Sequence, residues 1–139
     1  MTTREYLMQL RTIDLDILNV QSEADSWREL AMRMGHDFSE IHVDKSPSPD
    51  RMESLVVKAA DSAAKADREK EILIYLKSTI EKQIKGIKDK ECNIMLWGYY
   101  HDRKTIESMS KEMSYSYRQG KRIMQKAVKL FEKEYGESY

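Results

Sequence analysis

The stretch from Thr3 to Met34 carries apolar residues at alternating spacings of three and four, the repeat of a coiled coil. No proline or glycine interrupts the repeat before Gly35, which should end a first helix. The apolar positions are Tyr6, Leu10, Ile13, Ile17, Val20, Ala24, Trp27, Ala31 and Met34. A helix of about 30 residues cannot bury such a seam alone, so it requires a partner helix.

A second long helix is predicted from Asp50 to about Lys88. Asp50 and Glu53 have the spacing of a capping box, and the prolines of residues 46–49 favour an extended chain before it. Its apolar positions are Met52, Val56, Ala59, Ala63, Ala66, Leu73, Leu76, Ile80, Ile84 and Ile87. We therefore predict an antiparallel helical hairpin over residues 1–88, with a connector at 35–50, which associates with further copies of itself.

The composition favours an all-α protein, since 35% of residues are charged and there are only 5 glycines and 2 prolines. Cys92 is the one cysteine, which excludes an internal disulfide and fits a reducing compartment. The chain contains neither a run of about 20 apolar residues nor an apolar signal core at its start. We expect a cytoplasmic protein that does not enter the membrane.

Residues 105–131 read as two short helices joined by a tight turn. Thr105 and Ser116 suit the N-caps, and Ser114 and Tyr115 form the turn. The inward stripe of the second helix is expected to be Gly120, Ile123, Ala127 and Leu130. A preceding apolar helix at 92–100, with Trp97 in the core, completes a helix-turn-helix module over residues 89–139, whose last three residues should fray.

All the charged side chains in the second of these helices, as far as Phe131, are basic. Residues 117–131 include five cations and no acid, although the chain has 24 basic and 24 acidic residues. The cations are Arg118, Lys121, Arg122, Lys126 and Lys129. Phosphate binding explains this asymmetry most simply, and a solvated basic face is the alternative.

These residues resemble region four of bacterial sigma factors and the related helix-turn-helix of phage late-gene activators of the ArpU and RinA type. The similarity lies in Thr105 to Ser110, the Ser114-Tyr115-Ser116 turn, and Ile123, Lys126-Ala127 and Phe131. Ser46 to Met52 is similar to the connector of that family, with one additional proline. Ser114 stands in place of the usual turn glycine, and Gly120 stands where an apolar residue is usual.

The resemblance implies a transcriptional regulator of phage or prophage origin that binds double-stranded DNA, with RNA polymerase as a further candidate partner. Arg118, Arg122 and Gln119 would contact bases, and Lys126 and Lys129 would contact phosphates. The full set of candidate DNA-binding residues is Thr105, Ser114, Ser116, Tyr117, Arg118, Gln119, Lys121, Arg122, Lys126 and Lys129.

No catalytic motif, cofactor-binding loop or metal-ligand spacing is present in the sequence, so we expect no enzyme, cofactor or metal. Two other functions fit the same pattern. One is a phage terminase small subunit or another packaging or assembly protein, which also joins a helix-turn-helix to oligomerising helices. The other is a coiled-coil adaptor whose basic helix does not bind DNA.

Overall fold

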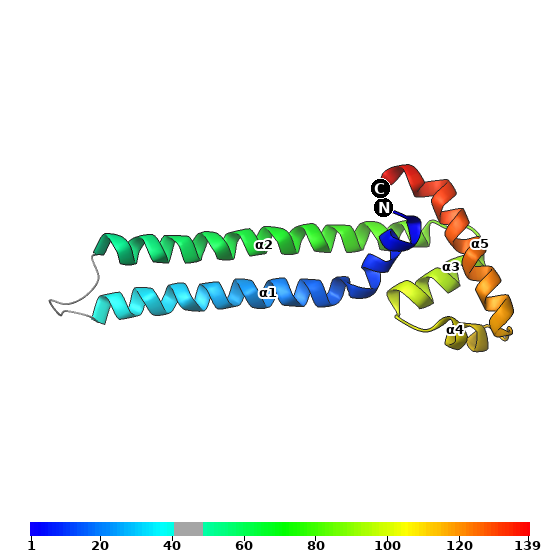
Figure 1. Ribbon diagram of the computed structural model, residues 1–139, viewed down its shortest axis with the longest axis horizontal. Coiled ribbons are helices and arrows are strands. Elements are labelled where there is room, and N and C mark those ends of the chain that lie inside the picture. Colours follow the sequence, from blue (N-terminus) through cyan, green and yellow to red (C-terminus); the bar gives the residue numbers. More distant parts are fainter. Residues whose placement is uncertain (41–48) are drawn as a thin grey trace. The chain divides into compact units, whose positions relative to one another are not determined.

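The computed structural model describes residues 1–40 and 49–139, and these form helices and turns without a strand. The predicted all-α class is confirmed. The elements are α1 (Thr3–Glu40), α2 (Pro49–Lys85), α3 (Lys90–Leu96), the π-helical turn η1 (Trp97–His101), α4 (Ile106–Glu112), α5 (Tyr117–Tyr135) and the 3-10 turn η2 (Gly136–Ser138) (Figure 1). Contacts divide the chain into two units, residues 1–14 with 75–139 and residues 15–74.

Residues 15–74 contain an antiparallel pairing of α1 with α2, as the sequence predicts (Figure 1). Arg28 of α1 pairs with Asp67 of α2, and Gln21 of α1 accepts a hydrogen bond from Lys70 of α2. The residue further along α1 therefore contacts the earlier residue of α2, which shows that the two helices are antiparallel. The buried apolar residues here are small: Ala24, Ala59, Ala63 and Ala66. Ile17, Val20 and Trp27, which were expected in the seam, are half-buried.

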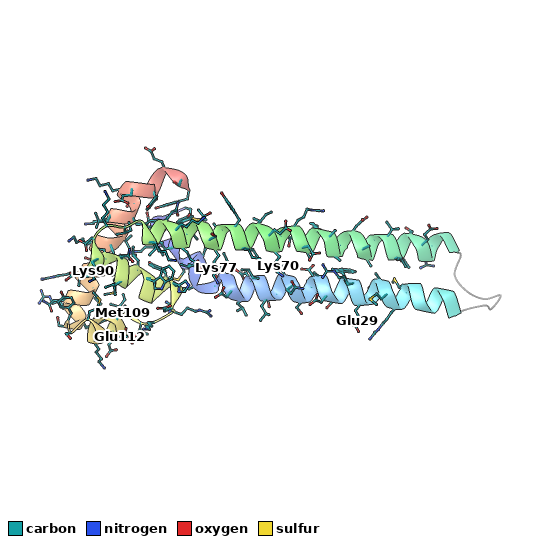
Figure 2. The ribbon with its side chains drawn as sticks, turned by 180° about the vertical axis from the view of Figure 1, so that it is seen from behind. Glu29, Lys70, Lys77, Lys90, Met109 and Glu112 are labelled. Atoms are coloured by element: carbon teal, nitrogen blue, oxygen red, sulfur yellow. The ribbon has the colours of Figure 1, made fainter. Side chains whose placement is uncertain are left out.

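The other unit joins both ends of the hairpin to the C-terminal helices in one core. The hydroxyl of Tyr6 donates to Gln83 at 2.7 Å, and the ammonium of Lys77 (labelled in Figure 2) lies 2.5 Å from the Asp14 carboxylate. Fully buried large side chains of this core include Leu7, Ile13, Ile80, Ile84, Met95, Leu96 and Phe131. The sequence analysis places a domain boundary after residue 88. The division in the structure differs from it, because residues 1–14 and 75–88 share their core with the helix-turn-helix.

Three predicted helix boundaries are wrong. α1 continues through Gly35 to Glu40, since a glycine inside a helix costs only about 1 kcal/mol and does not by itself stop it. α2 begins at Pro49, a residue favoured at the first helical position, so Asp50 is not its cap. It ends at Lys85 instead of Lys88. The extended chain predicted for residues 46–49 is wrong at Pro49, which is helical, and its other residues lie outside the described residues.

The C-terminus is ordered by aromatic contacts, so the predicted fraying of residues 137–139 is wrong. The ring of Tyr139 stacks on Tyr6 with centroids 4.1 Å apart, and its hydroxyl donates to Thr3 at 2.5 Å. Phe131, which is fully buried, lies beside both rings. These long-range contacts connect the end of the chain to the first turns of α1.

Among the described residues, no helix combines the length and apolar character that crossing a membrane requires.

Candidate nucleic-acid interface

The turn between α4 and α5 is a Schellman motif with a serine at its left-handed position. The Tyr115 amide donates to the Ser110 carbonyl at 2.8 Å, and the Ser114 amide donates to the Lys111 carbonyl at 3.1 Å. Ser114, which stands in place of the usual turn glycine, has φ of 61°, in the left-handed region. An L-residue there costs roughly 1–2 kcal/mol, which the two hydrogen bonds offset.

Both helices of the pair begin at the predicted caps. Thr105 Oγ1 accepts from the Ser108 amide at 3.0 Å and so caps α4. Ser116 Oγ accepts from the Gln119 amide at 3.2 Å, while Gln119 Oε1 accepts from the Ser116 amide at 3.3 Å. This reciprocal capping box satisfies two amides that the helix itself leaves unpaired.

Gly120 brings α5 into close contact with α4. A Cβ atom at this position would overlap the hydroxyl of Ser110 and lie 2.9 Å from Ser110 Cβ. The Ser110 hydroxyl donates to the Ile106 carbonyl at 2.7 Å, so it is held in place and buried. Met109, labelled in Figure 2, is buried on the neighbouring face of α4. The glycine is therefore a packing requirement of the two-helix unit.

The inward face of α5 is partly different from the predicted one. Gly120 and Ala127 are buried as expected, but Ile123 and Leu130 are half-buried at its edge. The buried residues are Gly120, Met124, Ala127, Val128 and Phe131. Both α3 and α4 pack against α5. The buried face is therefore rotated by about a sixth of a helical turn from the stripe that spacing alone favours.

The solvent face of α5 carries a basic stripe. Its members are exposed and follow one another at offsets of three and four, which places them along one side of the helix. They are Arg118, Arg122, Gln125, Lys129 and Lys133. A groove of about 450 Å³ runs beside the latter four residues. Gln125 and Lys133 were not among the predicted site residues, although their helical spacing from Arg118 and Arg122 could have indicated them.

Two other predicted residues lie at the edge of this stripe. Tyr117 is 50% exposed, and the Lys121 ammonium lies 4.5 Å from its ring centroid, a cation–π contact. Gln119 is exposed, but its carbonyl oxygen is engaged in the capping box. A bidentate contact with adenine needs that oxygen as well as the amide nitrogen. Gln125, which is exposed, is better placed than Gln119 for a bidentate contact with adenine.

Lys126 lies at the opposite edge and has an internal partner. Its ammonium is 3.1 Å from the carboxylate of Asp89, the N-cap of α3. The pKa of Asp89 is lowered by the Cys92 amide that donates to it and by Lys126. The pair positions Lys126 beside α3, and a phosphate contact by this side chain would compete with the carboxylate.

A side-chain cap that the sequence analysis missed joins the hairpin to this module. The Asn93 amide nitrogen donates to the carbonyl oxygens of Ile84 at 3.1 Å and Ile87 at 3.0 Å. These carbonyls belong to the end of α2 and the turn after it, where backbone acceptors have fewer donors than inside a helix. The sequence signal that could have indicated this cap is an asparagine a few residues after Gly86, where the second long helix ends.

Trp97 is half-buried and not part of the core, so its predicted position is wrong. Its ring stacks on His101 with centroids 3.9 Å apart, and the Lys85 ammonium lies 5.2 Å from it. Tyr100 is buried instead. The physical reason is the π-helical turn at Trp97–His101, which is wider than an α-helical turn and changes the side chains that face inward.

Cys92 is fully buried, and burial raises the pKa of its thiol to about 11. The thiol is therefore protonated at neutral pH, which disfavours nucleophilic chemistry. Among the side chains that the structure describes, no three of His, Cys, Asp or Glu are grouped so that they could hold a metal ion.

No protein-family model, curated protein or solved structure matches this chain. The resemblance to phage late-gene activators therefore stays a prediction from the residues themselves.

Proposed function

We propose that this protein is a sequence-specific DNA-binding regulator of transcription, of phage or prophage origin, which acts in the cytoplasm of a bacterial host. The observation that carries the proposal is the basic stripe on α5, presented by a helix pair with a tight turn and two capped N-termini. A helix of this kind, backed by two others, suits the major groove of DNA.

In this proposal, the start of α5 reads bases and its later turns meet phosphates. Arg118 and Arg122 are exposed near the N-terminus and can each present two donors to a guanine edge. Gln125 lies on the same face, one turn further along. Lys129 and Lys133 follow where a groove-bound helix leaves the bases, so their charges would neutralise the backbone.

The hairpin supports self-association and offers a surface for RNA polymerase. In residues 15–74, Leu15, Leu18, Ile72 and Ile74 are 57%, 64%, 67% and 47% exposed, while the buried seam is mostly alanine. Large aliphatic side chains on a helix pair with so small a core favour burial against another protein surface. A second copy of the hairpin is the simplest partner, through residues 1–88.

The test begins with selection of bound duplexes from a pool of random DNA. We expect an enriched motif, which Arg118→Ala or Arg122→Ala binds more weakly by about 1–3 kcal/mol, with little change on a scrambled duplex. Lys129→Ala should weaken binding to both duplexes alike, because a phosphate contact carries no base preference. Melting temperatures should stay near that of the parent, since these side chains are exposed.

A pool without enrichment, or basic variants that bind every duplex like the parent, would contradict the proposal and favour the adaptor interpretation. A packaging protein would also bind DNA and associate. It would differ by forming a ring of defined stoichiometry in solution and by leaving transcription from its bound sites unchanged.

A further inference from the structure

A second cationic surface flanks α5 on the side of Lys121. Two adjoining hollows, of about 370 and 300 Å³, share Tyr99 and Ile106 in their linings. The first is also lined by Arg4, Met8 and Lys121, and the second by Arg11, Glu107 and Tyr117. Both lie within the unit of residues 1–14 and 75–139. The first turns of α1 therefore form one wall of a surface whose other wall is the helix-turn-helix.

The charge of this surface is positive. Arg4, Arg11 and Lys121 come from two elements, and Glu107 is the one acid among the described lining residues. Glu107 lies 3.9 Å from the ammonium of Lys111, which offsets its charge.

The nearby acids of α1 are engaged elsewhere. The Glu5 carboxylate accepts from the Thr2 amide at 3.0 Å, at the start of the helix. The carboxylate of Asp14 is held by Lys77 at 2.5 Å and by Arg103 at 2.9 Å. Neither carboxylate is among the lining residues of the two hollows.

The two arginines have a spacing suited to a phosphate backbone. Arg4 and Arg11 are seven residues apart on one face of α1, with Met8 between them, a rise of roughly 10 Å. Phosphates on one DNA strand recur about every 3.4 Å along the duplex axis, so that rise corresponds to about three phosphates.

Arg11 is held in position before any ligand arrives. Its guanidinium lies 4.4 Å from the ring centroid of Tyr99 and donates to the Arg103 carbonyl at 3.2 Å. A guanidinium fixed in this way loses less conformational freedom when it binds an anion.

We propose that α1, through Arg4 and Arg11, binds the phosphate backbone of the same duplex that α5 reads. This inference rests on the proposed function and extends the DNA-binding surface beyond the helix-turn-helix, to the first turns of the hairpin. Lys121, on the same flank, contributes to this backbone contact.

The experiment measures the salt dependence of binding to the selected duplex and to its scrambled form. Arg4→Ala should lower the slope of log K against log salt concentration by about one unit, and Arg4→Ala with Arg11→Gln by about two. The preference between the two duplexes should not change. Arg4→Lys with Arg11→Lys, which keeps both charges, should retain most of the parent slope. Arg68→Ala, at an exposed position of α2 in residues 15–74, is the matched control and should leave the slope unchanged.

The outcomes separate the two proposals. A parent that binds no duplex overturns the proposed function together with this inference. A parent that binds, and that Arg122→Ala weakens, while the Arg4 and Arg11 variants keep its salt slope, overturns the inference alone. An equal decrease for Arg68→Ala would reveal a general charge effect and would also overturn it. Should the double variant fail to fold, Arg4→Ala decides the result, because Arg4 is exposed.

Discussion

Gly120 is the residue at which the two helices of the candidate interface come closest. An alanine in its place would gain about 1 kcal/mol of helix propensity. The added methyl group would, however, overlap the held hydroxyl of Ser110, and overpacking of this kind costs about 1–3 kcal/mol. We expect Gly120→Ala to lower the free energy of unfolding in a denaturant titration and to weaken DNA binding by separating α4 from α5.

Gly136→Ala is the matched control for this substitution. Gly136 has right-handed φ of −58°, and a Cβ there would meet only Glu132 Cγ at 3.4 Å, an ordinary contact. It should leave stability unchanged or slightly raised. A Gly120→Ala variant that is as stable as Gly136→Ala would show that α4 and α5 can separate without cost.

Ser114 should behave in the opposite way. Because its φ of 61° suits glycine, Ser114→Gly should raise the free energy of unfolding by about 1 kcal/mol. Thermal melting is a sufficient measurement, with Ser108→Gly, inside α4, as a control that should destabilise by a similar amount. A lower melting temperature for Ser114→Gly would mean that the serine hydroxyl has a stabilising contact beyond the turn.

At the scale of the element, features that depend on near neighbours in sequence were predictable. The caps at Thr105 and Ser116 and the left-handed turn at Ser114 depend on residues at most five positions apart. The position of Trp97 was not predictable in this way, since a π-helical turn changes its direction and apolar spacing gives no sign of that turn. The inward face of α5 was only half predictable, because it depends on the position of α3.

The candidate site also combines features that depend on near neighbours in sequence with features that depend on distant residues. The basic stripe could be read from helical spacing within one segment. Three features depend on contacts between residues far apart in sequence: the pairing of Lys126 with Asp89, the place of Arg4 beside Lys121, and the place of Arg11 beside Tyr117. Periodicity within a helix does not determine which part of another helix lies against it.

Substitution of Asn93 tests how strongly its hydrogen bonds join the end of α2 to the C-terminal helices. Its amide nitrogen donates to the carbonyls of Ile84 and Ile87, and the Ile84 carbonyl also accepts from the Ile87 amide. Asn93→Ala should lower the free energy of unfolding by about 1–3 kcal/mol, because it removes hydrogen bonds in a partly buried position. Asn19→Ala, at an exposed position of α1, should have almost no effect. Equal stability of the two variants in urea would show that water replaces the Asn93 contacts.

At the scale of the whole molecule, the two units have different cores, which suggests different roles in DNA binding and in self-association. The unit of residues 1–14 and 75–139 contains a core with large aromatic and aliphatic side chains, together with the candidate DNA surface. Residues 15–74 bury mainly alanines and leave large aliphatic residues in solvent. A helix pair of this kind has little apolar burial to stabilise it as a single copy, which makes association with a second hairpin the natural source of further stability.

This argument predicts that self-association depends on residues that the single chain leaves exposed. Leu15→Glu with Leu18→Glu should reduce the mass of the particle in analytical ultracentrifugation to that of one chain and should lower its melting temperature. Glutamates on that surface would have to be desolvated in the associated state, which is costly for an unpaired charge. Asn19→Glu with Ser22→Glu adds the same charges on the same face of α1, at offsets of four and seven from Leu15, and should have the same effect. A parent with the mass of one chain would contradict self-association itself. A leucine variant with the parent mass would instead place the contact on another face of the hairpin.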